Sequence, residues 1–118
     1  MQITLIQLRI FAEKWKRLGL TDDDLRLLEQ QLLGRPESGD LIPGTGGLRK
    51  IRFAPASWHS GKRGATRVIY AFFLSADRVY LFTIYGKNEQ TDLSAEEKSV
   101  FRKVLQQLRN ELLKVRSP

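Results

Sequence analysis

The chain contains no cysteine among its 118 residues and only one histidine, His59. The lack of cysteine excludes disulfides, a thiolate zinc site and a cysteine nucleophile. With a single histidine, the chain cannot cleave RNA with a pair of histidines as acid and base. A metal site built from histidines is also not expected. We interpret His59 as an incidental loop residue, and we expect neither a metal nor a cofactor.

Long apolar runs are also missing. No stretch approaches the roughly 20 apolar residues that a membrane-spanning helix needs, and the N-terminus lacks the basic start and apolar run of a secretory signal. Hydrophobic residues make up 42% and charged residues 28%, which is ordinary globular usage. We therefore expect a soluble, cytoplasmic protein folded as a single domain over residues 1–118.

Acidic residues are absent from the whole stretch between Asp40 and Asp77. The basic residues of that stretch are Arg49, Lys50, Arg52, Lys62, Arg63 and Arg67. They account for most of the net charge of +7. A cluster of one sign costs self-repulsion, and its most common partner is a polyanion such as nucleic acid. Acidic proteins and anionic lipid surfaces remain as alternatives.

Hydrophobic periodicity predicts a strand, two helices, three strands and a final helix. The expected strands cover 2–8, 48–54, 66–74 and 79–85, the last two joined as a hairpin. The second helix is expected to begin after Thr21 as N-cap, and the last after Ser94, which opens a capping box. The pattern favours an α+β fold with a mostly antiparallel sheet, two N-terminal helices and a C-terminal helix. We expect the helices to pack on one face of that sheet.

Strand alternation sorts the basic side chains. Lys50 and Arg52 alternate with apolar neighbours, so both should point to the open face of their strand. Arg67 lies in the next strand, where most apolar side chains share one face, and it should point to the other face of that strand. Tyr85 ends the third strand and Lys87 follows it. If the three strands are neighbours, these five residues converge on one positive surface.

Other motifs are better explained by structure than by chemistry. The glycine-rich segment 44–47 lacks the spacing of a phosphate-binding loop, and we read it as a tight turn. The three aspartates 22–24 suit the first turn of a helix better than a metal site. Trp15 belongs to the predicted core, whereas Trp58 is open to either core packing or stacking on a base.

Three collinear segments resemble the HigB branch of the RelE/ParE toxin superfamily. They are GDLIPGTGGLRKIR (39–52), GKRGATRVIY (61–70) and LFTIYGKNE (81–89). The resemblance extends over nearly the whole chain and implies a RelE-like fold. It also implies an mRNA interferase, a ribosome-dependent endoribonuclease that cuts translated mRNA and inhibits translation. A HigA-like antitoxin protein would hold it inactive, and mRNA on the ribosome and ribosomal RNA would be its other partners.

The resemblance also implies site residues. Lys50 and Arg52 match the family's basic pair, Arg67 its following arginine, and Tyr85 and Lys87 the tyrosine and basic segment at the end of the last strand. Contacts to RNA or the ribosome are expected from Arg49, Lys62, Arg63 and Asn88. Three features depart from the family pattern: Asn88 replaces an arginine of the RelE branch, Leu93 stands near the place of its late tyrosine, and the C-terminal histidine of some HigB relatives is missing.

The implied reaction needs little chemistry from the protein, because RNA carries its own nucleophile, the 2′-OH. Arg52 and Arg67 are expected to clamp the phosphate. Lys50 or Lys87 is expected to transfer protons, because crowded cations lower a lysine pKa. Tyr85 would stack on a base or orient it. Two other functions stay open, a ParE-like gyrase poison and a non-catalytic RNA- or protein-binding module. A monomer is expected for the free protein.

Overall fold

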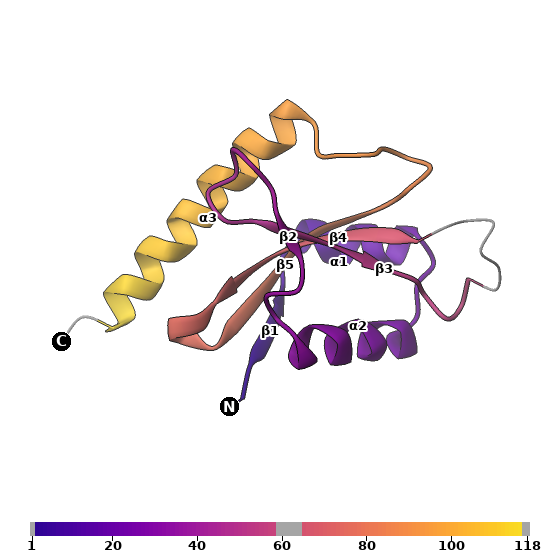
Figure 1. The fold of residues 1–118 in the computed structure, drawn as a ribbon, viewed down its shortest axis with the longest axis horizontal. Helices are drawn as coiled ribbons and strands as arrows, with labels where there is room; N and C mark the ends of the chain where they lie inside the picture. The colour runs from indigo at the N-terminus through magenta and orange to yellow at the C-terminus, as the bar shows by residue number, and fades with distance from the viewer. Residues whose placement is uncertain (1, 59–64, 117–118) are drawn as a thin grey trace.

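A five-stranded sheet in the order β1-β5-β4-β3-β2 forms the centre of the molecule (Figure 1). The structure is a computed structural model that describes residues 2–58 and 65–116. β1 pairs in parallel with β5, and the other neighbours are antiparallel, as predicted. The short β2 at the sheet edge was not predicted. The strands are β1 (Thr4–Gln7), β2 (Asp40–Leu41), β3 (Arg49–Phe53), β4 (Thr66–Phe73) and β5 (Arg78–Gly86).

Three helices accompany the sheet: α1 (Arg9–Arg17), α2 (Asp22–Gly34) and α3 (Ala95–Arg116). Thr21 caps α2 by accepting a hydrogen bond from the Asp24 amide at 3.1 Å, while the Asp24 carboxylate accepts one from the Thr21 amide at 3.0 Å. Ser94 and Glu97 form the same reciprocal box at the start of α3, with distances of 2.9 and 3.0 Å. Both predicted helix starts are confirmed.

The helices cover both faces of the sheet, so the expectation of one covered face was wrong. α1 and α2 pack on one side, where Phe11, Trp15, Leu28 and Leu32 meet apolar residues of β3, β4 and β5. α3 packs on the other side, and Figure 1 shows the sheet separating it from α2. The α3 side is built from Leu48, Ile69, Ala71, Tyr80, Phe82, Tyr85, Leu93, Phe101, Leu105 and Leu112.

The reason lies in the two central strands. β5 is buried at every position after Arg78, and β4 is buried at five of its eight. A strand with one wet face alternates apolar and polar residues, whereas a strand buried on both faces reads as a nearly continuous apolar run. Such strands need an apolar cover on each side, and α3 supplies the second one.

A β-bulge interrupts the pairing of β4 with β5. Ile69 pairs with Thr83 while its neighbour Tyr70 pairs with Leu81, which leaves Phe82 as an extra residue in β5. A bulge shifts the strand's alternation by one residue. Beyond it, Ile84 faces the α1/α2 side and Tyr85 faces the α3 side.

The segment between α2 and β3 is held by buried hydrogen bonds. The Tyr70 hydroxyl accepts from the Gly39 amide at 2.9 Å and donates to the Pro36 carbonyl at 2.7 Å. The glycine-rich segment 44–47 is a tight turn, as predicted. Gly47 has φ +134°, and a Cβ there would lie 2.5 Å from the Arg109 guanidinium.

Candidate nucleic-acid interface

Three predicted site residues form one row across the sheet. Arg52 of β3 is the register partner of Arg67 in β4, and Arg67 is the partner of Tyr85 in β5. Directly opposed residues on antiparallel strands have Cα atoms about 5 Å apart. All three lie on the α3 side of the sheet, because the bulge brings Tyr85 to that side. The structure therefore brings two arginines and a tyrosine together, as the prediction required.

The two arginines are opposed like charges. Arg52 is exposed, and its guanidinium has no hydrogen-bond or ion-pair partner within the described residues. Arg67 is half-buried, and among residues 2–58 and 65–116 its guanidinium has one hydrogen bond, a long one at 3.3 Å to the adjacent Thr66 carbonyl. Like charges directly opposite on neighbouring strands repel each other. An anion bound between the two guanidinium groups would remove that repulsion.

Lys50 lies two residues from Arg52 on the same face of β3. Its ammonium donates to the Asp92 carboxylate at 2.8 Å. That hydrogen bond and the lysine charge hold the pKa of the Asp92 carboxyl below its usual value. Lys50 was expected to be surrounded by other cations, which was the reason for expecting it to transfer protons. The structure instead gives it a carboxylate partner, Asp92. Sequence reasoning missed Asp92, which has no strand or motif to mark it.

Tyr85 is buried, with 1% of its surface exposed. Its hydroxyl donates to the Thr91 carbonyl at 3.3 Å and so ties the segment 87–94 to the sheet. Burial raises the pKa of the Tyr85 hydroxyl, and nearby Asp92 raises it further, against the effect of Arg67. In this conformation the Tyr85 ring is packed in the core on the α3 side, next to Arg67 on the neighbouring strand, and is not available for stacking on a base.

The remaining predicted residues lie around this row. Lys87 and Asn88 are exposed just beyond the end of β5. Arg49 is on the opposite face of β3, where its guanidinium donates to the carbonyls of Glu37 at 3.1 Å and Gly39 at 2.8 Å. The structure does not bring Arg49 together with the row. Lys62, Arg63 and His59 lie outside the described residues.

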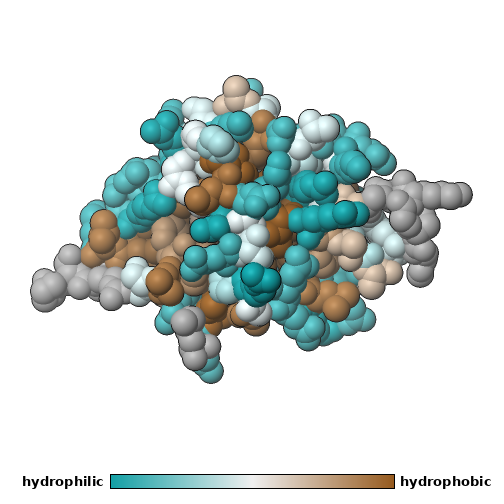
Figure 2. Space-filling view, viewed as in Figure 1, coloured by the Kyte–Doolittle hydropathy of each residue, from teal (hydrophilic) through white to brown (hydrophobic). Residues whose placement is uncertain are grey.

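Figure 2 shows the surface over these elements. Next to the grey segment, hydrophilic side chains are mixed with pale and tan ones, and brown apolar side chains also appear toward α3. No group of three histidine, cysteine, aspartate or glutamate side chains with metal-binding spacing occurs in residues 2–58 and 65–116. The same part of the chain has no helix long and apolar enough to span a bilayer.

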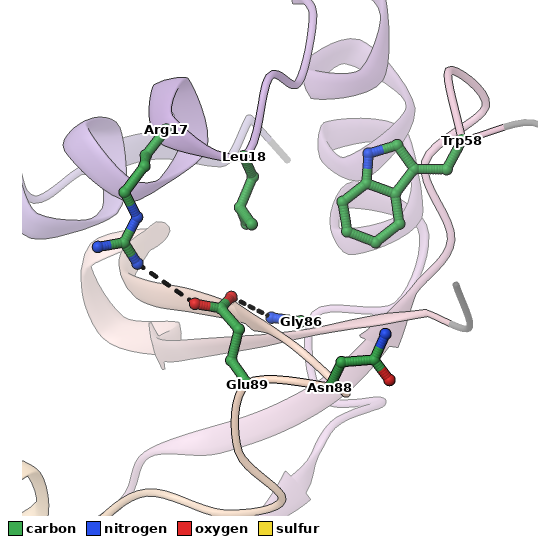
Figure 3. Close-up of a pocket in the computed structure, with 6 residues that line it drawn as sticks. All are labelled: Arg17, Leu18, Trp58, Gly86, Asn88 and Glu89. Atoms are coloured by element: carbon green, nitrogen blue, oxygen red, sulfur yellow. Dashed lines mark hydrogen bonds and ion pairs between the residues drawn. The ribbon is translucent and has the colours of Figure 1, made fainter. Parts of the chain in front are cut away.

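A pocket opens on the other side of the sheet end, between α1 and the turn after β5 (Figure 3). Its lining residues are Arg17, Leu18, Trp58, Gly86, Asn88 and Glu89. Arg17 and Glu89 form an ion pair at 3.4 Å across its rim. Trp58 is half-buried against the α1/α2 core. The sequence left open whether Trp58 packs on the core or stacks on a base. In the structure the indole packs on the core and also lines this pocket.

The segment that carries Trp58 is anchored to α2. The Asp24 carboxylate, 1% exposed, accepts hydrogen bonds from the Ser57 amide at 3.2 Å and from the Ser57 hydroxyl. Burial raises the pKa of the Asp24 carboxyl, but the hydrogen bonds from Ser57 and Thr21 outweigh burial and hold it below its usual value. The predicted role of the helix-start aspartates is therefore confirmed for Asp24, with a tertiary contact added.

The fold is that of a RelE-like α+β protein. No known family's sequence model matches the chain. Among solved structures, the chain is similar to a double arginine-to-alanine mutant of the Escherichia coli toxin RelE in the free state, with a TM-score of 0.52 and 15% identity. The match covers 76% of this chain and 88% of that one. At this identity the likeness concerns the fold.

Proposed function

We propose that this protein is the toxin of a type II toxin–antitoxin system, a metal-independent endoribonuclease that cuts translated mRNA on the ribosome. The observation that carries the proposal is the row in which Arg52 and Arg67 are register partners on one face of the sheet. Two unneutralised guanidinium groups side by side suit a phosphodiester. The RelE-like fold and the three HigB-like segments support the same function.

In the proposed mechanism the RNA 2′-OH attacks the adjacent phosphate after losing its proton. Arg52 and Arg67 hold the phosphate in line and stabilise the negative charge that grows on its oxygens. The 5′-oxygen of the next nucleotide leaves and takes up a proton. Tyr85 acts as a positioning residue, because it is the register partner of Arg67 in the same row and anchors the segment 87–94.

Proton transfer is assigned to Lys50 or Lys87. Lys50 is next to the clamp, and its ammonium, which donates to Asp92, has a proton to give to the leaving 5′-oxygen. Lys87 is exposed beyond the end of β5 and can reach a substrate that crosses there. Replacing each in turn distinguishes them, since only the proton-transferring lysine should change the pH dependence of cleavage.

The surrounding residues are proposed to contact RNA and the ribosome. Asn88 is exposed just beyond the end of β5, Arg49 is on the other face of β3 from the row, and Lys62 and Arg63 belong to the acid-free stretch. A HigA-like antitoxin with an acidic segment would neutralise this basic surface. That complex is the expected resting form of the toxin in the cytoplasm.

The test is a map of mRNA 5′ ends after brief induction of the chain. Wild type should produce new cuts within translated frames, and Arg67→Ala should reduce them about 100-fold, the usual loss for one donor to a developing negative charge. Arg9→Ala is the matched control, because Arg9 is 92% exposed at its side chain and forms an exposed ion pair with Glu13 on the same helix. It should cut like wild type.

The alternatives give different results in the same cells. A ParE-like gyrase poison would leave messages intact and cause DNA damage. A non-catalytic binding module would leave both the messages and the DNA intact. Full cutting by a folded Arg67→Ala variant would remove the arginine clamp from the mechanism even if the chain is a nuclease.

A further inference from the structure

We infer that the pocket lined by Trp58 and Asn88 receives an unstacked purine base of the RNA, next to the phosphate that is cut. This inference rests on the proposed function and adds a base-reading site to it. Proteins read single-stranded RNA by splaying bases onto aromatic side chains and hydrogen-bonding their edges. The pocket offers both an aromatic wall and a polar edge.

The apolar wall is formed by Leu18 and Trp58. Figure 3 shows the two side chains on one side of the cavity, facing Asn88 and Glu89 on the other. The cavity volume is about 350 Å³, within the range of small-ligand sites. A planar base placed there would lie against the indole. Such stacking is sequence-tolerant by itself, because every base has a π-face.

The floor of the pocket is Gly86, which leaves room that a side chain would fill. A Cβ at this position would lie 3.4 Å from Glu89 Oε1 and 4.0 Å from Trp58 Cη2. These are ordinary contact distances, and the Gly86 backbone is not in the left-handed region. The chain could therefore hold alanine here without strain, and the alanine methyl would occupy the space proposed for the base.

The polar edge is provided by Asn88. Glu89 is already engaged, since one carboxylate oxygen accepts from the Gly86 amide at 2.8 Å and the other pairs with Arg17. Asn88 is exposed and its amide points toward the indole (Figure 3). The amide nitrogen can donate to N7, an acceptor that both purines have and pyrimidines lack. This contact makes the pocket selective for purines.

The pocket is adjacent to the arginine row. Gly86 follows Tyr85 directly and pairs with Thr66, the neighbour of Arg67. The two sites therefore lie one residue apart along the strands, on opposite faces at the same end of the sheet. Lys87 follows Gly86 in the chain and is exposed at that end. An RNA strand with one phosphate on the arginines would pass the end of the sheet to place a flanking base in the pocket, where Arg17 is held at the rim by its ion pair with Glu89.

The experiment is the 5′-end map with four further variants. In wild type, cuts should carry a purine at one fixed position relative to the broken bond. Asn88→Ala should lower the purine-to-pyrimidine ratio there about tenfold, measured over the cuts that this variant still makes. Gly86→Ala should have a similar effect, because its methyl group narrows the pocket between Glu89 and Trp58. Trp58→Phe, which keeps an aromatic wall, should retain the preference, and Asn110→Ala, an exposed asparagine on α3, is the matched control.

Each outcome decides a different point. A purine preference that is lost in Asn88→Ala and Gly86→Ala but kept in Asn110→Ala supports the base pocket. Wild-type cuts without any fixed purine, or a preference unchanged in both pocket variants, overturn the pocket and leave the nuclease intact. No cuts by wild type overturn the proposed function, and the pocket loses its substrate with it.

Discussion

Replacing Asp24 with alanine should lower the free energy of unfolding by about 3 kcal/mol, because three donors lose their shared acceptor. The carboxylate accepts hydrogen bonds from the Thr21 amide, the Ser57 amide and the Ser57 hydroxyl. Each such bond contributes about 1 kcal/mol, and more when the acceptor is charged. The site is 1% exposed, so water does not easily replace the lost acceptor. A loss of this size is a large part of the free energy of unfolding of a typical native protein, which is about 5–15 kcal/mol.

The assay is urea unfolding followed by tryptophan fluorescence and circular dichroism. Asp23→Ala is the matched control, since this aspartate is in the same helical turn but is 89% exposed at its side chain and pairs with Arg26. It should cost about 0.5 kcal/mol or less. Equal effects from both substitutions would show that the helix dipole matters and the link to Ser57 does not.

The same carboxylate predicts a pH dependence with a definite sign. Its pKa is below the usual value in the folded chain, so its stabilising contribution is complete at neutral pH. The contribution is lost as the pH falls below about 4, toward the folded-state pKa. The stability difference between wild type and Asp24→Ala should therefore shrink in acid. A difference that stays constant from pH 7 down to about 2 would contradict this reasoning.

Three further predictions concern other parts of the molecule. Tyr70→Phe should cost about 2 kcal/mol in urea unfolding, because it leaves a buried amide and carbonyl without partners; a loss below about 0.5 kcal/mol would refute this. Gly47→Ala should destabilise more than Gly44→Ala, since the φ of +134° at Gly47 is farther from the left-handed region that other residues can adopt than the φ of +81° at Gly44, and its Cβ would also displace the end of the Arg109 side chain; equal melting temperatures would contradict this reasoning. Arg52→Ala should reduce the salt dependence of single-stranded RNA binding by about 0.7 in the log–log slope, and Arg9→Ala should leave it unchanged.

Much of the fold was predictable because its signals are local. The starts of α2 and α3 follow from Thr21 and Ser94 with their acidic partners three residues on, and a capping box needs only neighbouring residues. Strand boundaries agreed within one or two residues for β3, β4 and β5. The wrong expectation, that helices cover one face, had a signal in the sequence. The nearly unbroken apolar run from Val79 to Tyr85 indicates a strand buried on both sides.

The candidate site was only partly predictable. Alternation along one strand placed Lys50 and Arg52 together, and it equally assigned Arg49 to the other face. Alternation could not predict that Tyr85 lies beside Arg67 on the α3 side. The bulge at Phe82 reverses the alternation of β5, and the bulge depends on pairing with β4. Asp92 and the pocket at Trp58 were missed for the same kind of reason, since their contacts join residues far apart in the chain.

The sequence by itself determined the element order, the helix starts, the excess of positive charge and its concentration in one acid-free stretch. These depend on residue types and on spacings of a few positions. Only the tertiary structure decided that Arg52 and Arg67 are opposed, that Lys50 is paired with Asp92, and that α3 covers the second face. Register, bulges and layer order are properties of strands that meet across the chain, and no local pattern fixes them.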